Sequence, residues 1–456
     1  MRSLKSHYFI TLFLAASSLA ACRDHSMNQD NKSATVAQET ANDPLSIHKR
    51  AIAIDMHADT VQRMLDERVD LQTQLNDGHF DAVRAKAGGL DAQFFSIWVE
   101  PQLFGGGGER AVKRADDQIA AIRTLADKHP ETWQLATTSE DVRRAAQDGK
   151  IAALMGLEGG YAIDEKLENV KRYYDLGVRY MSPAWSVSTS WAGSSGDEVG
   201  ATRGLNDFGK NVVREMNRLG MMVDVSHVSD QTFWDIVYTS TKPVIATHSA
   251  CRAIANVPRN LTDEMIRALA NTGGVVNVIF YPEHLEPGWS ELKKKVDVEI
   301  APLVQQASTA EPGDAVHKKL ARDRVRAREY AKRLPAVHVS RIVDHIDHVV
   351  KLVGWTTSGL DRTLTACKAR PSIWQLLRTC RISLKNFCGV VTRKLTSTRS
   401  WVEICCESWT RNRESDASHS KDSAEDRFSR SHQRWIAQRA DRRERYRLRH
   451  GAVVLT

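Results

Sequence analysis

The stretch LNDFGKNVVREMNRLGMMVDVSHVSD, residues 205–230, contains a complete helix followed by a complete strand. Apolar residues recur every three or four positions from Phe208 to Met216, which predicts a helix with one buried face, and Gly220 is a typical helix stop. The run MMVDVSH that follows is mostly apolar until it ends in His227, as expected for a strand buried on both faces of a parallel sheet. The stretch therefore predicts an α/β fold whose strands end in polar residues.

This helix-and-strand unit recurs along most of the chain. Six more short apolar runs alternate with helix-like segments, at 51–57, 92–99, 151–159, 178–184, 244–250 and 275–281. Seven strands that alternate with helices predict a (β/α)8 barrel of the TIM type. The eighth strand should follow a helix expected at 340–354, but the apolar pattern fails at Trp355, so we expect this strand to be missing or scrambled.

A charged insertion, residues 282–339, separates the seventh predicted strand from that last helix. It includes the segment KKLARDRVRAREYAKRL, whose simplest interpretation is a solvated surface helix. With this insertion, the barrel domain is expected to span residues 48–354.

The N-terminus has the features of a targeting segment. Arg2 and Lys5 precede a short apolar run that ends in LAAC, which is similar to a bacterial lipobox. We therefore expect residues 1–22 to be a lipoprotein signal peptide, with Cys22 carrying lipid after cleavage. An ordinary secretory signal with an incidental cysteine is the alternative. The polar residues 23–47 would then form a tether.

The positive charge of the chain is concentrated at its C-terminal end. The formal net charge is +8, yet residues 355–456 hold 21 Lys+Arg against 10 Asp+Glu, whereas residues 1–354 hold 43 against 46. The tail also holds five of the seven cysteines, without a spacing typical of disulfides or zinc ribbons. A change this abrupt indicates either a separate module, such as one that binds nucleic acid, or a segment never selected as protein.

Four of the predicted strands end in residues that can bind metal ions. His57 and Asp59 follow the first strand two positions apart, so both side chains can face one ion, and Glu158, His227 and His248 end three further strands. The carboxyl ends of barrel strands meet at one rim, where active sites form. A lone histidine at a strand end is more often a core residue, but four strands that each deliver a ligand favour a metal centre. These ligands suit zinc or another borderline divalent ion, and five of them with one bridging carboxylate fit two ions.

The motifs IDMHADT, GLEGG and ATHSACRAIANVPRNLTDE, together with residues 205–230, resemble the membrane (renal) dipeptidases, peptidase family M19. The resemblance covers roughly residues 48–354 and implies a (β/α)8 barrel with two zinc ions. Carried onto this chain, it implies that His57 and Asp59 bind one zinc ion and that His227 and His248 bind the other. It also implies that the catalytic Glu158 bridges both ions.

The resemblance implies hydrolysis of dipeptides by a metal-bridging hydroxide, with the zinc ions polarising the peptide carbonyl. Arg259, in the motif VPRN, would hold the terminal carboxylate of the substrate. In the family, a histidine after the fourth strand often helps to hold the oxyanion, and Trp185 occupies the matching position here. An indole N–H can donate one hydrogen bond but carries no charge, so substrate preference or oxyanion stabilisation should differ.

The break at Trp355 has a specific interpretation. After the last barrel helix the family pattern is similar to VDHVGLGSDFDG, an eighth strand with an aspartate at its mouth, whereas this chain reads WTTSGLDRTLTA. Codons for the observed residues can be chosen so that a reading frame shifted by one base spells VDHVGLGSDFDG. We therefore predict that one base was lost near codon 354 and that residues 355–456 are an aberrant, out-of-frame and disordered basic tail. Without the strand and its aspartate, the chain should fold poorly and have little activity.

The sequence thus predicts a zinc-dependent dipeptidase at the bacterial cell envelope, anchored by lipid on the periplasmic or outer-membrane side. Dipeptides are the expected substrates, the assembly is a monomer or a homodimer, and nucleic acid is not an expected partner. Two alternatives stay open. The partial barrel could bind metal or a small ligand without catalysis, or the enzyme could act on another small amide.

Overall fold

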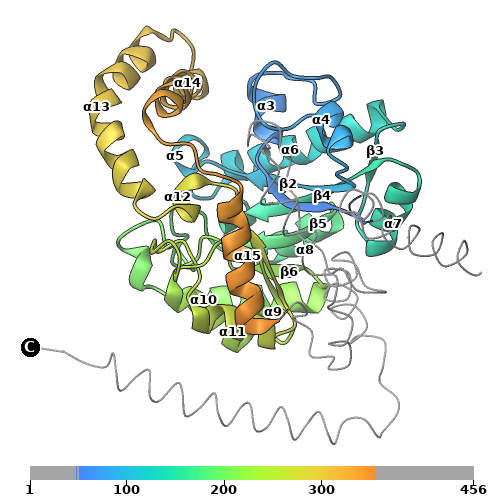
Figure 1. The fold of residues 1–456 in the computed structure, drawn as a ribbon. Coiled ribbons are helices and arrows are strands. Elements are labelled where there is room, and N and C mark those ends of the chain that lie inside the picture. Colours follow the sequence, from blue (N-terminus) through green and yellow to red (C-terminus); the bar gives the residue numbers. More distant parts are fainter. Residues whose placement is uncertain (1–47, 49–50, 355–456) are drawn as a thin grey trace, which may run out of the picture. The chain divides into compact units, whose positions relative to one another are not determined.

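The computed structural model describes residue 48 and residues 51–354 (Figure 1). Eight parallel strands form one sheet in this part of the chain. They are β1 (Ile54–Ala58), β2 (Ala92–Trp98), β3 (Trp133–Leu135), β4 (Ile151–Glu158), β5 (Val178–Ser182), β6 (Met222–Asp224), β7 (Val244–Ser249) and β8 (Val275–Val278).

Seven of these strands form a nearly closed barrel, in the order β1-β2-β4-β5-β6-β7-β8. Among the described residues, β1 and β8 do not pair with each other, so the barrel lacks one closure. All seven barrel strands were predicted from the sequence, as was the missing eighth. The short strand β3 was not predicted; it pairs with the first half of β4, from the register of Trp133 with Ile151 to that of Leu135 with Ala153.

Helices connect the strands and surround them. The α-helices are α3 (Val61–Asp66), α4 (Ala82–Ala87), α5 (Pro101–Phe104), α6 (Glu109–Lys128), α7 (Ser139–Gln147), α8 (Leu167–Asp175), α9 (Asp207–Leu219), α10 (Asp230–Thr239), α11 (Asp263–Asn271), α12 (Pro282–Leu285), α13 (Trp289–Ala310), α14 (Ala315–Arg333) and α15 (Ser340–Val353). Two 3₁₀ helices are η1 (Gly160–Ile163) and η2 (Gly200–Thr202). Helix α9 ends at Gly220, whose φ of 81° is the left-handed conformation that glycine adopts without strain.

Alternating residues on each strand face two different apolar layers. On β4, Ala152 and Leu154 belong to a cluster inside the barrel, while Ala153 and Met155 belong to the cluster between sheet and helices. All eight residues of β4 are buried. Because both faces of the strand are covered, its sequence is nearly continuous in apolar residues, which explains why the strands were recognisable.

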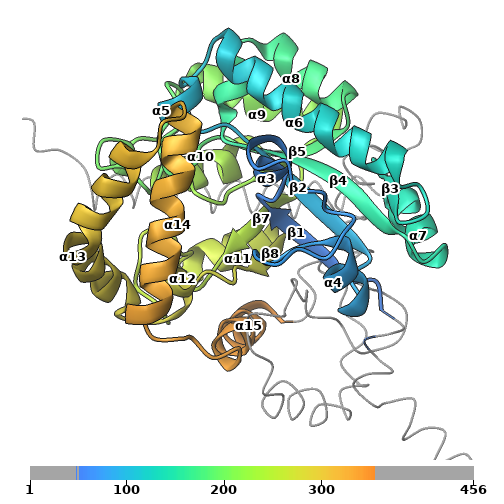
Figure 2. The ribbon, with the colours of Figure 1, turned by 90° about the horizontal axis from the view of Figure 1, so that it is seen from above.

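The insertion after β8 forms a helical hairpin. Helices α13 and α14 lie side by side in both views (Figures 1 and 2), and Val296, Ile300 and Val304 of α13 form the core of their contact. The helix predicted from KKLARDRVRAREYAKRL is confirmed as α14. The final predicted helix is confirmed as α15, which packs beside α11 through a 2.7 Å contact between His348 Nε2 and Asp263 Oδ1.

Several predictions concern residues outside the described part of the chain: the signal peptide 1–22 with Cys22, the tether 23–47 and the tail 355–456. They stay predictions. Within the part that the structure describes, no helix combines the length and apolar character needed to cross a bilayer.

Candidate metal centre

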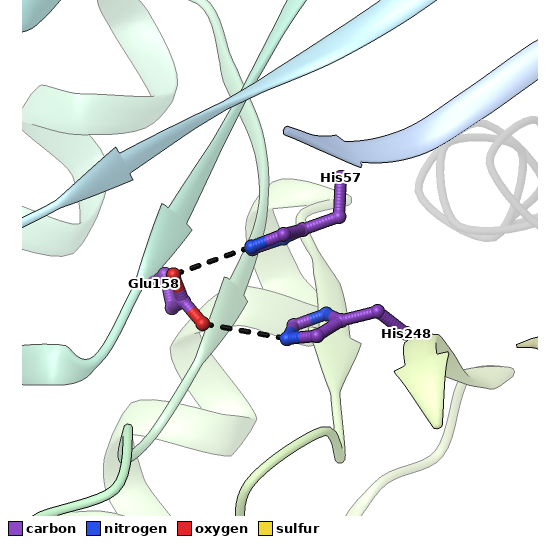
Figure 3. A group of neighbouring side chains, drawn as sticks. All are labelled: His57, Glu158 and His248. Atoms are coloured by element: carbon purple, nitrogen blue, oxygen red, sulfur yellow. Dashed lines mark ion pairs between the residues drawn. The ribbon is translucent and has the colours of Figure 1, made fainter. Parts of the chain in front are cut away.

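The carboxyl ends of the strands bring four of the predicted ligands together. His57 lies on β1, Glu158 is the last residue of β4, His248 lies on β7, and His227 follows β6 by three residues. Figure 3 shows the imidazoles of His57 and His248 one above the other, with Glu158 facing both. The register of β1 shifts between Asp55 and Ala58, so the strand is irregular at its ligand.

The two oxygens of Glu158 face different ligands. Oε2 lies 3.3 Å from Nε2 of His57, whereas Oε1 lies 2.8 Å from Nε2 of His227 and 3.4 Å from Nε2 of His248. Asp59 joins the first group, with Oδ1 3.4 Å from Nε2 of His57, and its side chain is 58% exposed. One carboxylate thus divides the cluster into two sets of ligands.

These distances fit the coordination of zinc. Nitrogen and oxygen ligands about 2.1 Å from a tetrahedral ion lie roughly 3.4 Å from one another. The pairs His57–Asp59, His57–Glu158 and His248–Glu158 are 3.3–3.4 Å apart. Nε2 of His227 and Nε2 of His248 are closer, at 2.8 Å, so this pair would separate slightly around an ion. The donor types and spacing therefore suit a divalent metal ion, and the ligand atoms of His57, Glu158 and His248 all lie within 4.8 Å of one another.

Tyr180 orients the imidazole of His57. The Tyr180 hydroxyl donates to the carbonyl oxygen of Met56 at 3.0 Å, so it accepts from Nδ1–H of His57, also at 3.0 Å. In the neutral imidazole of His57, Nε2 is then the nitrogen without a hydrogen, and it faces Glu158. Gly156 makes room for the phenol ring, because a Cβ at that position would lie 2.0 Å from Cζ of Tyr180.

A threonine and an aspartate orient His248 in a similar way. The Thr247 hydroxyl donates to Oδ2 of Asp224 at 2.7 Å, so it accepts from Nδ1–H of His248 at 2.8 Å. Nε2 of His248 is thereby left as a lone pair for an ion. Hydrogen bonds of this kind hold metal-binding histidines in one tautomer and orientation.

His227 has an unusual backbone conformation. Its φ is 71°, a left-handed value that is uncommon for a residue with a side chain and costs on the order of 1–3 kcal/mol. The backbone N–H of Ser195 and the hydroxyls of Ser194 and Ser195 all donate to the His227 carbonyl oxygen, at 2.9–3.3 Å. These bonds hold the turn that directs the imidazole toward Glu158.

Burial and charge act against each other in the cluster. Burial would lower the pKa of His57, but the adjacent Glu158 carboxylate holds that pKa well above its usual value. Burial, followed by the charge of Arg259, lowers the pKa of His227 to about 4. Burial, followed by the charge on His57, lowers the pKa of His248 well below its usual value. His227 and His248 are therefore neutral at neutral pH, which is the form that binds metal.

The cluster lies at one side of a cavity of about 1,310 Å³. Arg259 and Trp185, which the sequence analysis proposed as substrate-binding residues, both line this cavity. The ring of Trp185 lies 4.8 Å from that of Trp98 and 6.3 Å from that of His227, measured between centroids. The part of the cavity wall formed by β8 and α15 is mostly apolar, with Val276, Val278, Ile342, Ile346, Val349 and Val350.

Arg259 is anchored by its own part of the barrel rim. Its guanidinium donates to the Ser249 hydroxyl at 3.0 Å and to the His248 carbonyl oxygen at 2.8 Å, while Nε has no hydrogen-bond partner among the described residues. Burial lowers the pKa of Arg259 to about 10, so the group stays charged at neutral pH. A fixed and partly unpaired guanidinium suits a carboxylate ligand.

Sequence reasoning missed the residues that orient the ligands. Ser96 donates to Oε2 of Glu158 at 3.0 Å, and Tyr180, Thr247 and Asp224 act as described above. Asp224 was detectable, because a carboxylate inside the apolar run MMVDVSH must be hydrogen-bonded when buried. Tyr180 gave no signal, since its contact with His57 spans more than a hundred residues.

Comparison with known proteins identifies the relatives of this chain. A family model for membrane dipeptidases, peptidase family M19, matches residues 42–373. The chain belongs to the M19 family. An uncharacterized dipeptidase of Schizosaccharomyces pombe is 33% identical to this chain over 219 residues. These residues are 46% of this chain and 54% of the relative. This M19 chain thus spans about half the length of that curated relative.

Solved structures share the fold. The probable dipeptidase PvdM from Pseudomonas aeruginosa matches with a TM-score of 0.55 and 24% identity, covering 68% of this chain and 83% of the other. A metallopeptidase from Rhodobacter sphaeroides, solved with a phosphinate mimic of the dipeptide L-Ala-D-Ala, matches with a TM-score of 0.51 and 23% identity, covering 67% and 83%. At this level of identity, these likenesses establish the M19 fold alone.

Proposed function

We propose that this M19 protein is built as a zinc-dependent dipeptidase with two ions in one centre. The observation that carries the proposal is the position of Glu158. Its side chain is 3% exposed, and its two oxygens face one imidazole on one side and two on the other. Leaving a buried carboxylate among three imidazoles is costly unless they share cations, and zinc ions satisfy all of these donors.

The residues around the centre have separate tasks. Ions held there would supply Lewis acidity and a water that is deprotonated near neutral pH. Glu158 would connect the two sets of ligands. Tyr180 and Thr247 would keep the Nε2 lone pairs of His57 and His248 directed at the ion positions. Arg259 would bind the terminal carboxylate of a dipeptide, and Trp185 would offer an uncharged N–H near the scissile carbonyl.

We also propose that the gene has lost one base near codon 354, so that the chain lacks its eighth barrel strand. The unpaired edges of β1 and β8 and the apolar cavity wall beside α15 support this proposal, because a buried parallel strand after Gly354 would cover both. The family match runs 19 residues past Gly354, to residue 373, and leaves residues 374–456 outside it. We expect low turnover from the chain as it stands.

An envelope location is a further proposal, and it rests on the N-terminal sequence. Lipid on Cys22 would hold the protein at the membrane, and residues 23–47 would separate the barrel from its surface. Growth with radiolabelled palmitate should label the wild-type protein and not Cys22→Ser. Labelling of both forms, or of neither, would contradict a lipid anchor at this cysteine.

The dipeptidase proposal is tested by metal binding and hydrolysis together. The full chain, stripped of metal and reloaded with zinc, should bind two equivalents and hydrolyse members of a dipeptide panel, slowly but above the metal-free blank. Glu158→Gln should lower zinc affinity and hydrolysis by more than about 100-fold, beyond the usual effect of changing an outer partner. Glu168→Gln, at an exposed position of α8, is the matched control and should change neither.

Each outcome separates the alternatives. Zinc binding without hydrolysis, even after the reading frame is restored, would support a non-catalytic binding protein. Hydrolysis of uncharged amides as readily as of dipeptides would instead support an enzyme for another small amide. A chain that binds no zinc would contradict the proposal as a whole.

A further inference from the structure

The hairpin of α13 and α14 forms part of the wall of the cavity. Trp289 and Ser290, at the start of α13, and Tyr330, near the end of α14, line the same cavity as the candidate metal ligands. The two helices lie side by side (Figures 1 and 2), and the apolar core between them is separate from the apolar clusters of the barrel. Because this core belongs to the hairpin alone, the two helices can move as one body.

Both ends of the hairpin meet at one buried side chain. Gly288 directly precedes α13 and has a φ of 76°, and Pro335 lies two residues after the end of α14. The indole N–H of the buried Trp289 donates to the Pro335 carbonyl oxygen at 3.2 Å. A Cβ at Gly288 would have no described atom within 4 Å, so the backbone turns there without crowding. The two connections therefore lie close together, as in a hinge.

Polar contacts join the hairpin to the barrel away from this hinge. Arg324 of α14 lies 3.2 Å from Glu67, and because its side chain is 68% exposed, this ion pair contributes little. Nζ of Lys319, on the same helix, lies 5.7 Å from the ring centroid of Trp98 at the end of β2, within the range of a cation–π contact. Burial raises the pKa of Glu100, and the nearby charge of Lys319 opposes this shift. Contacts of this size hold the hairpin against the barrel but allow it to open.

The ring of Trp98 connects Lys319 with the substrate side of the cavity. This ring lies 4.8 Å from that of Trp185, which lines the cavity beside His227. The backbone of Trp98 is fixed by the buried Gln118, which accepts from its N–H at 3.1 Å and donates to its carbonyl oxygen at 2.8 Å. The ring that supports Trp185 is therefore also the ring that the hairpin contacts.

We propose that the α13–α14 hairpin is a hinged cover of the cavity, and that in its closed position Lys319 holds Trp98, and through it Trp185, in place. Lys319 is thus a positioning residue that acts on the substrate through two rings. This inference rests on the proposed dipeptidase function, in which Trp185 offers its N–H near the scissile carbonyl. Opening of the hairpin admits a dipeptide, and closing completes the wall of the cavity and fixes the indole.

Hydrogen exchange tests the cover without any substrate. Lys319→Met keeps the length of the side chain but removes its charge, whereas Lys319→Arg keeps the charge. Lys318→Met, at the exposed neighbouring position, and Asp323→Asn, which removes the partner of Lys319 within α14, are the matched controls. In the zinc-loaded full chain, we expect Lys319→Met to exchange residues 286–291 and 333–339 about three- to tenfold faster than the wild type, and the other three variants to match it. Equal rates in Lys319→Met and the wild type would overturn the hinged cover.

Calorimetric titration with a phosphinate mimic of an alanyl-alanine dipeptide tests the link to Trp185. We expect Lys319→Met to weaken binding about three- to tenfold, and Lys319→Arg to recover most of the loss. In a Trp185→Phe background, which lacks the indole N–H, Lys319→Met should have little further effect, because the contact acts through that indole.

The outcomes separate this inference from the function on which it rests. If Lys319→Met weakens binding equally in both backgrounds, or in neither, Lys319 does not act through Trp185, and the dipeptidase proposal stands. If the wild-type protein does not bind the mimic, the proposed function fails and this inference fails with it. Thermal unfolding of each variant distinguishes a lost contact from a lost fold.

Discussion

Strands β4 and β8 occupy the same barrel but differ in how far the fold surrounds them. β4 pairs along one edge with β2 and along its other edge with β3 and β5, and all eight of its residues are buried. β8 pairs with β7 alone among the described strands, and its last two residues, Asn277 and Val278, are only partly buried. The candidate metal ligands come from β1, β4, β6 and β7 or the turns after them, so only His57 and Asp59 lie on or next to a strand at the open side of the barrel.

This difference shows that bringing the candidate ligands together and completing the barrel are separate requirements. Four ligand-bearing elements converge without β8, because pairing from β1 through β7 is continuous. The cavity extends from these ligands to the apolar side chains of β8 and α15, where a dipeptidase of this family would be expected to have its last strand. The chain can thus keep its metal centre and still lack a wall of the substrate site.

Restoring the reading frame should have the largest effect of all the changes considered, and the quantity that it changes is dipeptide turnover. A gene with one base inserted near codon 354 would encode VDHVGLGSDFDG after α15. Dipeptide turnover should rise by about 10²–10⁴-fold, the range typical of regaining a positioned acid or base. Steady-state assays of both proteins at equal zinc occupancy would measure the change. Equal turnover would show that the open edge between β1 and β8 is harmless.

Changing the side chains that orient the candidate ligands should have the next largest effect, which is a loss of zinc affinity. Tyr180→Phe and Thr247→Val each remove the hydroxyl that accepts from a ligand imidazole, and each should weaken zinc binding by about 10–100-fold. Competition with a zinc chelator measures both affinities, and Tyr238→Phe is a control remote from the centre. Because both residues lie on the complete side of the barrel, the losses should be the same in the frame-restored protein.

One substitution placed on each side of the barrel measures packing directly. Val178 on β5 is fully buried, so Val178→Ala should cost about 2–3 kcal/mol, including the cavity that it leaves. Val278→Ala on β8 should cost less than about 1 kcal/mol, because that side chain is only partly buried. Urea denaturation gives both values. In the frame-restored protein, the cost at Val278 should approach that at Val178.

The pH dependence of stability gives the smallest effect. Burial, followed by the charges of Arg259 and His227, lowers the pKa of His284 in α12 to about 3 in the folded protein, against about 6.5 in an unfolded chain. As the pH falls below about 6.5, the unfolded chain takes up a proton that the folded protein does not, so stability decreases until about pH 3. His284→Phe should remove about 1 kcal/mol of the loss between pH 6 and pH 5. Urea denaturation of metal-free protein at both values measures it, and an unchanged slope would contradict a buried neutral His284.

Much of the fold was predictable because its signals are local. A strand covered on both faces is apolar at nearly every position, so β4 and β7 could be recognised without knowing their neighbours. The short β3 escaped detection because three residues carry too little periodicity. At the site, the polar strand ends indicated His57, Glu158 and His248 as candidate metal ligands. Nothing in the sequence connected Tyr180 with His57, because the two residues are far apart in the chain.

The sequence by itself determined the barrel class, the polar strand ends that supply the metal ligands, and the position at which the pattern breaks. Each of these depends on residue types at short spacing. The tertiary structure alone decided which oxygen of Glu158 meets which imidazole and that Tyr180 and Thr247 select the tautomers. It also decided that the amide of Asn260 donates to the carbonyl oxygen of His284. These contacts join residues far apart in the chain, and their geometry exists only after the strands have paired and curved.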